Sequence, residues 1–226
     1  MFGFDATQLG RIALTVCIVL CATILHEVAH AAVAYKLGDP TAKENGRLTL
    51  NPAAHLDPFG SVLLPILMAI AGGPIFAFAK PVPYNPNRLK HPVRDEVLVA
   101  LAGPVCNLVQ ATMGAVAFRL CYQGLLNPGV ASTPLLVACD ALGTYVYLNL
   151  MLMFFNLIPL PPLDGSAIIF PLLKGEARRG YYVVQRYSMP ILLAVLFLLP
   201  MVLPVSPLSI YLNATAGNLA DLMLGL

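Results

Sequence analysis

The chain has 226 residues, of which 58% are hydrophobic and 11% are charged, and its mean hydropathy is +0.79. These values lie outside the range of ordinary soluble domains, so a membrane is the expected surrounding. The net charge of +2 is small and no basic run alternates with aromatic residues, so we expect no nucleic-acid partner. The five cysteines lie in apolar stretches without a C-x-x-C pair, and we expect them to serve packing rather than redox chemistry.

Residues 9–37 form the first long apolar segment and predict a helix that spans the membrane. The segment exceeds the roughly 20 residues that cross a hydrocarbon layer. It is interrupted by His26, Glu27 and His30, and a Gly-Asp-Pro sequence follows it as a stop signal for the helix. Because the functional residues lie inside this segment, we expect it to be retained rather than removed as a signal peptide.

Two features are predicted between the first span and the next confident one. Residues 41–50 contain Asn45-Gly46 between short segments, which predicts a small β-hairpin. The apolar stretch at 59–79 contains Pro65 and a Gly-Gly-Pro sequence, so it is either a full span or a re-entrant segment. Residues 80–94 are rich in proline and asparagine and predict a loop.

The remaining apolar stretches complete the predicted fold. Further spans are expected at 97–122, 135–158 and 188–205, and the placement of the tail to residue 226 stays open. The sequence therefore predicts an all-α polytopic membrane protein, a helical bundle with a small β-hairpin and a re-entrant segment. We expect residues 1–226 to form a single domain.

The sequence His26-Glu27-Val28-Ala29-His30 carries the predicted chemistry. Histidines four apart on a helix share a face, and two imidazoles placed in this way can bind one Zn²⁺. Glu27, next to the first histidine, can act as a general base toward a water molecule at the metal. Ionisable residues inside a span are costly and indicate function. The pattern predicts a zinc metalloprotease with one Zn²⁺ per chain; the alternative is a polar patch that joins helices.

A third zinc ligand is required, because a catalytic zinc normally has three protein ligands and one open position. Asp164 is the best candidate. It follows a long apolar span, lies in a Pro-Pro-Leu-Asp-Gly sequence, and is the only acidic residue between residues 141 and 175. The alternative is an ordinary turn aspartate before glycine.

The sequence resembles the site-2 protease family of intramembrane zinc metalloproteases. The resemblance rests on five motifs that occur in order: HEVAH at 26–30, NPAAHLDPFG at 51–60, AKPVPYNP at 79–86, ALAGPVCN at 100–107 and NLIPLPPLDG at 156–165. It implies that His26, His30 and Asp164 bind zinc and that Glu27 is the catalytic base. It also implies that Asn107 positions the substrate or the developing oxyanion, although Asn107 could instead form a hydrogen bond between helices.

His55 lies in the second motif and is open to two interpretations. A conformational or gating role and an ordinary polar contact within a loop fit its position equally well.

The predicted topology follows from the need to bring the ligands to one depth. The spans at 9–37 and 135–158 must then run parallel, which requires an odd number of membrane crossings between them. The span at 97–122 supplies one crossing, so residues 59–79 should not cross the membrane. With this topology, all 13 lysine and arginine residues except Arg11 and Arg119 fall on the side of the motif. The positive-inside rule then places the N-terminus outside and the active site toward the cytosol in a multi-pass protein of the cell membrane.

We therefore predict an intramembrane zinc metalloendopeptidase that hydrolyses a peptide bond in or near the transmembrane segment of another membrane protein. The expected partners are this substrate and the lipid bilayer, and the sequence makes no prediction of the oligomeric state. The hairpin at 41–50 is predicted to pair with an extended substrate strand. Two alternatives are a non-catalytic scaffold that binds membrane helices and a metal transporter. The intact Glu27 argues against the scaffold, and ligands that converge on one site argue against the transporter.

Overall fold

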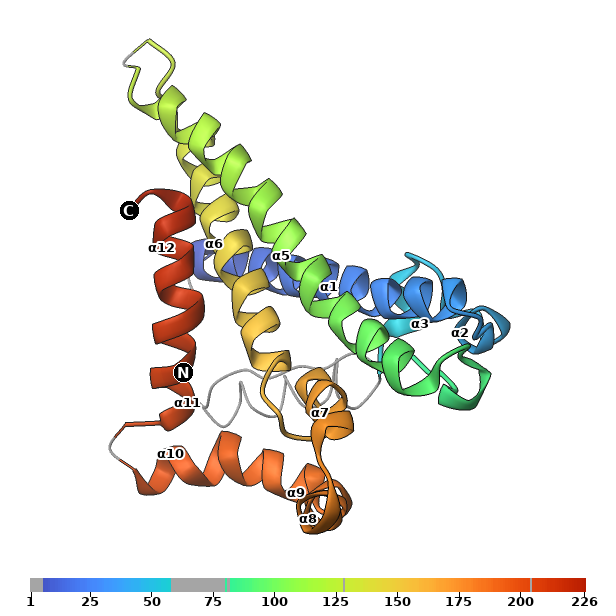
Figure 1. Cartoon of the computed structure of the whole chain (residues 1–226). Coiled ribbons are helices and arrows are strands. Elements are labelled where there is room, and N and C mark those ends of the chain that lie inside the picture. Colours follow the sequence, from blue (N-terminus) through green and yellow to red (C-terminus); the bar gives the residue numbers. More distant parts are fainter. Residues whose placement is uncertain (1–5, 58–79, 81, 128, 204) are drawn as a thin grey trace. The chain divides into compact units, whose positions relative to one another are not determined.

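A computed structural model describes residues 6–57, 80, 82–127, 129–203 and 205–226 (Figure 1). Helices dominate these residues, and no β-strand occurs among them. The chain divides into two compact units, which are described separately: unit 1 comprises Met1–Ala22 and Pro104–Leu226, and unit 2 comprises Thr23–Gly103. The predicted re-entrant segment at 59–79 lies outside the described residues, and the single domain over 1–226 stays a prediction.

Three long apolar helices confirm the first three confident spans of the sequence. These are α1 (Ala6–Lys36), α5 (Pro92–Leu125) and α6 (Thr133–Asn156), and each is long and apolar enough to cross a membrane. The chain leaves α1 at Gly38, whose φ of 111° is a conformation that favours glycine. A proline lies in the first two positions of α6, where a missing N–H costs no helical hydrogen bond.

The predicted β-hairpin at 41–50 is wrong, because the chain forms the short helix α2 (Thr41–Glu44) there. The N–H groups of Gly46 and Arg47 donate to carbonyls of α2 at 3.0 and 2.8 Å, and Gly46 has a φ of 66°. This is the hydrogen-bond pattern of a helix that ends at a left-handed glycine. The Asn45-Gly46 pair therefore ends a helix instead of joining two strands, and the proposed pairing of a hairpin with substrate is lost with it.

Asp39 connects the end of α1 to the loop that follows residue 80. It is fully buried, and its carboxylate accepts hydrogen bonds from the N–H and hydroxyl of Thr41 and from the N–H of Asn85. Burial acts to raise the pKa of Asp39, but these hydrogen bonds and the charge of Arg88 outweigh it, so the pKa lies below its ordinary value. Arg88 also forms a 2.7 Å ion pair with Glu44. These contacts connect the end of α1 and the start of α2 to the loop that follows residue 80.

The remaining short helices of unit 2 flank this loop. They are α3 (Pro52–His55) and the 3-10 helix η2 (Pro86–Arg88). Each begins after an asparagine whose side chain accepts a backbone N–H of the first turn, and each has a proline in its first positions. The predicted loop at 80–94 therefore contains η2 and the first residues of α5.

Unit 1 continues after α6 with short helical elements. In order they are α7 (Asp164–Ile169), η3 (Phe170–Leu172), α8 (Gly175–Arg186), α9 (Ser188–Leu193), η4 (Ala194–Leu198), α10 (Leu199–Val202), α11 (Pro207–Leu212), η5 (Asn213–Gly217) and α12 (Asn218–Leu224). The stretch from α9 to α10 corresponds to the predicted span at 188–205. Its axis makes an angle of 75° with α8, and α8 and this stretch together are apolar and long enough to form one broken span or a re-entrant loop.

The tail, whose placement the sequence left open, packs along α6 (Figure 1). Buried side chains of α5, α6 and the tail form the core of this unit, among them Ala111, Val146, Leu150, Ala216 and Ala220. The alanines let the helices approach closely, as small residues do at helix contacts in membranes.

Arg119 of α5 holds the C-terminal end of α12. Its guanidinium donates to the carbonyls of Met223 and Leu222 at 2.8 and 3.0 Å. The last carbonyls of a helix have no partner within the helix, and a cation near them is favourable. This contact fixes the tail to a residue about a hundred positions earlier in the chain.

Candidate metal centre

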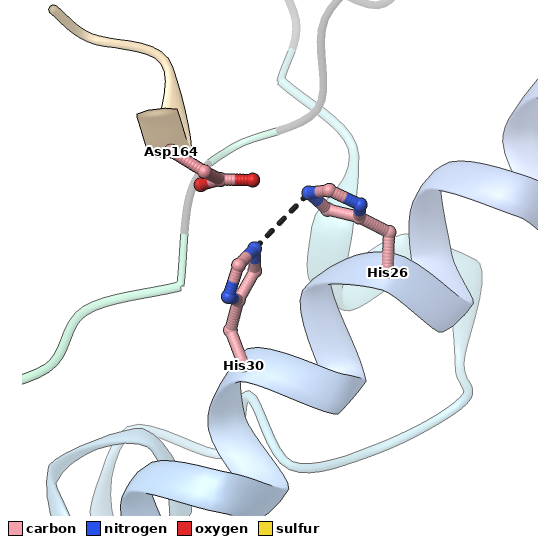
Figure 2. Close-up of side chains that lie close together, drawn as sticks. All are labelled: His26, His30 and Asp164. Carbon is pink, nitrogen blue, oxygen red and sulfur yellow. Dashed lines mark hydrogen bonds between the residues drawn. The ribbon is translucent and has the colours of Figure 1, made fainter. Parts of the chain in front are cut away.

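Two histidines of α1 bring their ring nitrogens together in unit 2. The Nε2 atoms of His26 and His30 lie 3.0 Å apart, with one ring edge-on to the other (Figure 2). His26 is buried and His30 is partly exposed. Two nitrogen atoms that bind the same zinc ion at about 2.0–2.1 Å in tetrahedral geometry lie about 3.3 Å from each other. The separation of the two nitrogens therefore fits a shared zinc ion.

A backbone carbonyl orients the second histidine. The Nδ1 atom of His30 lies 2.6 Å from the carbonyl oxygen of Val99 in α5. Because a carbonyl oxygen accepts only, Nδ1 carries the hydrogen, and Nε2 of the neutral ring keeps its lone pair for a metal. Metal-binding histidines commonly show this outer hydrogen bond. The role of Val99 could not be predicted from the sequence, because a backbone acceptor leaves no signal in the residue type.

Glu27 is held from the loop that follows residue 80. Its Oε2 atom accepts a hydrogen bond from the N–H of Val82 at 3.0 Å. Val82 is buried and packs with Ala31 of α1 and Ala42 of α2. The loop therefore fixes one carboxylate oxygen of Glu27. The sequence placed this loop correctly but did not indicate that its backbone contacts the glutamate.

Asp164 belongs to unit 1, where it is the first residue of α7. The next residue, Gly165, lies against the end of α6: a Cβ atom there would come closer than 3.0 Å to the backbone carbonyls of Leu157 and Ile158. This close approach requires glycine and explains the Asp-Gly pair locally. The assignment of Asp164 as a zinc ligand stays a prediction.

Asn107 lies in a buried polar network of unit 1. Its Nδ2 atom donates to Oδ1 of Asn149 in α6 at 3.0 Å, so the predicted alternative of a hydrogen bond between helices is present. Asn149 in turn donates to the carbonyl of Tyr145, and the Tyr145 hydroxyl donates to Oε1 of Gln110, each at 2.9 Å. The predicted role of Asn107 toward a substrate or an oxyanion stays a prediction.

The network includes residues that sequence analysis missed. Asn149 is fully buried and Gln110 nearly so, and both lie inside apolar spans. Polar residues inside an apolar span are costly unless they are hydrogen-bonded. The presence of these two amides inside apolar segments was therefore a signal that the sequence already contained.

His55 is buried in unit 2, and its Nε2 atom lies 2.8 Å from the carbonyl oxygen of Thr49. This is the polar loop contact that the sequence allowed. The carbonyl of His55 also accepts the N–H of Lys80. His55 thus joins α3 to residues on both sides of it.

Comparisons with known proteins cover about four fifths of the chain. The sequence model of Peptidase family M50 matches residues 131–199. Two similar proteins share the name "Putative zinc metalloprotease". YwhC of Bacillus subtilis is 43% identical over 178 residues, which cover 78% of this chain and 76% of that protein. Rip2 of Mycobacterium tuberculosis is 33% identical over 184 residues, or 80% of this chain and 65% of that protein. No solved structure matches the chain.

Proposed function

Because the chain belongs to peptidase family M50, the site-2 protease family, we propose that it hydrolyses a peptide bond in or near the transmembrane segment of another membrane protein. The family makes the chain a zinc metalloendopeptidase with zinc as its cofactor, and its apolar helices make it a membrane protein. The observation that carries the finer proposal is the position of the histidine pair. His26 and His30 lie within α1, a helix apolar enough to cross a membrane.

We assign the zinc ligands to His26, His30 and Asp164. The 3.0 Å separation of the two Nε2 atoms and the hydrogen bond from His30 to Val99 support the two histidines. Asp164 is supported by the need for a third ligand and by its Leu-Asp-Gly motif, in a segment that the family model covers. Two imidazoles and a carboxylate are a ligand set that suits zinc.

Zinc, when bound, polarises a carbonyl group and lowers the pKa of water. In the proposed reaction, Glu27 takes a proton from the attacking water and passes it to the departing amine. The N–H of Val82 holds the carboxylate in place through one oxygen. Asn107, which is buried and lies in the AGPVCN motif, supplies an amide N–H to the developing oxyanion.

The site is proposed to face the cytosol in the cell membrane, with the N-terminus outside. The support is the distribution of charge, because all lysines and arginines except Arg11 and Arg119 fall on the side of the motif in the predicted topology. The substrate is expected to be a membrane protein whose helix unwinds locally, since a helix hides its carbonyls in hydrogen bonds.

The test compares the full chain with Glu27→Gln, both purified in detergent, on a single-span reporter protein. We expect both proteins to bind one zinc ion and the variant to cleave at least about a hundredfold more slowly, as loss of a general base does. Glu44→Gln is the matched control, because this exposed glutamate pairs with Arg88 on the surface. Equal cleavage by wild type and Glu27→Gln would refute the assignment of the base. Zinc binding without any cleavage by the wild type would favour the scaffold alternative.

A further inference from the structure

Gly103 of α5 lies against the histidine pair. A Cβ atom built at this position would come closer than 3.0 Å to Nε2 of His30 and to both Nε2 and Cε1 of His26. Real Cβ atoms essentially never approach other atoms so closely, so a side chain here would force a movement. The three nearest atoms all belong to the two histidine rings, and two of them are the nitrogens assigned to zinc.

The same face of α5 also carries the acceptor that orients His30. Val99 lies four residues before Gly103, and residues four apart share one face of a helix. The Val99 carbonyl fixes Nδ1 of His30 at 2.6 Å, while Gly103 faces the opposite, Nε2 edge of the rings. One helical turn of α5 therefore contacts Nδ1 of His30 through Val99 and faces the Nε2 atoms of both histidines at Gly103.

We infer that Gly103 is a positioning residue of the zinc site. Its lack of a side chain lets α5 approach the histidines closely enough for Val99 to orient His30, and it places no side-chain atom of residue 103 on the Nε2 side of the rings, where the ion would bind. This inference rests on the proposed function, because it takes His26 and His30 as ligands. A methyl group at position 103 would compete with the ion for that side of the rings or push the rings apart.

Close packing of helices is the competing explanation for a glycine in a span. Gly114, eleven residues later in α5, is an example of a glycine that serves close helix packing. A Cβ atom there would meet side-chain atoms of Tyr145 and Val146 in α6 at 2.8 and 3.0 Å. Gly114 is thus crowded by the packing of α6 and not by the histidines. Gly114→Ala is therefore the matched control for Gly103→Ala.

The test uses the full chain in detergent as wild type, His26→Ala, Gly103→Ala and Gly114→Ala. Zinc affinity is measured by competition with a chelating dye, and the visible absorption of bound Co²⁺ reports the geometry of the site. We expect Gly103→Ala to bind zinc at least tenfold more weakly with an altered Co²⁺ spectrum, and Gly114→Ala to stay within about twofold of wild type. If Gly103→Ala matches wild type while His26→Ala loses zinc, the inference is overturned. If His26→Ala keeps its zinc, the proposed metal site fails instead.

A second measurement covers a Gly103→Ala protein that does not fold well. The double variant Gly103→Ala with His26→Ala removes one ring that the new methyl group would strike. In metal-free protein, we expect the double variant to regain at least half of the loss in unfolding temperature, because neighbouring changes couple. Losses that simply add would place the role of Gly103 in general packing and overturn the inference.

Discussion

Replacing Asp39 with alanine should destabilise unit 2 and reduce proteolysis. The carboxylate is fully buried and accepts three hydrogen bonds, two from Thr41 and one from the N–H of Asn85. Asn85 belongs to the same loop as Val82, whose N–H holds Glu27. The substitution therefore releases the loop that orients the proposed base, although it touches none of the proposed zinc ligands.

The size of the effect follows from the donors that lose their partner. The N–H groups of Thr41 and Asn85 remain behind, and a buried unsatisfied donor costs about 1–3 kcal/mol, with the lower part of that range applying to these part-buried groups. The Thr41 hydroxyl can turn to another acceptor and contributes little. We therefore expect Asp39→Ala to lower the free energy of unfolding by about 2–4 kcal/mol. Asp39→Asn keeps one oxygen acceptor and the volume of the side chain, and it should lose about half as much.

The assay is unfolding in mixed detergent, followed by the fluorescence of a dye placed on an introduced cysteine in α2, together with zinc content and reporter cleavage. Cleavage should fall at least tenfold in Asp39→Ala while zinc content stays near one per chain. A change in the free energy of unfolding below about 0.5 kcal/mol, the range of neutral surface substitutions, would refute this reasoning.

The hydrogen bonds to the Asp39 carboxylate should also make the stability of the protein depend on pH in acid. Because the pKa of Asp39 is lowered in the folded protein, its carboxylate contributes stability that is present above the unfolded pKa of about 3.9 and is lost as the pH falls through the folded pKa. Wild type should therefore lose stability relative to Asp39→Ala as the pH falls below about 4. Parallel pH curves for the two proteins would contradict the assignment.

Three further predictions address unit 1. Asn149→Leu should cost about 1–2 kcal/mol in detergent unfolding, because it leaves the buried amide of Asn107 without its partner; an unchanged unfolding curve would argue against the network. Arg119→Met should loosen the end of α12 by about 1 kcal/mol and speed its hydrogen exchange, since two carbonyls lose their donor; the exchange of α6 serves as the internal reference. Gly165→Ala should lower zinc affinity at least fivefold by displacing Asp164, and full affinity in a folded variant would count against Asp164 as a ligand.

The spans were predictable because apolar length and helix-ending residues determine them. The predicted first span at 9–37 corresponds to α1 (Ala6–Lys36), and the stop signal lies at Gly38 as expected. The error at 41–50 has a local cause. An Asn-Gly pair suits a tight hairpin turn and also the end of a helix. The helix is favoured here by the buried carboxylate of Asp39, which accepts the N–H of Thr41, the first residue of α2.

The proposed ligands and base were predictable from residue type and spacing, whereas their supports were not. His26 and His30 stand four apart, and that spacing alone predicts the contact of their rings. Val99 and Val82 act through backbone atoms, which any residue carries, so their roles depend on where the chain folds. The contact of Gly103 with the histidine rings could not be predicted, because a single sequence does not show what lies opposite the missing side chain.

The amide network between α5 and α6 has a consequence for how the two helices assemble. Apolar side chains can exchange one neighbour for another at little cost inside a bilayer, so they define the alignment of two helices poorly. Asn107, Gln110 and Asn149 do not tolerate such an exchange. A shift of one helix by a single turn, about 5.4 Å, would leave their amides in hydrocarbon. The hydrogen bonds of the network therefore specify one depth and one rotation of α5 relative to α6.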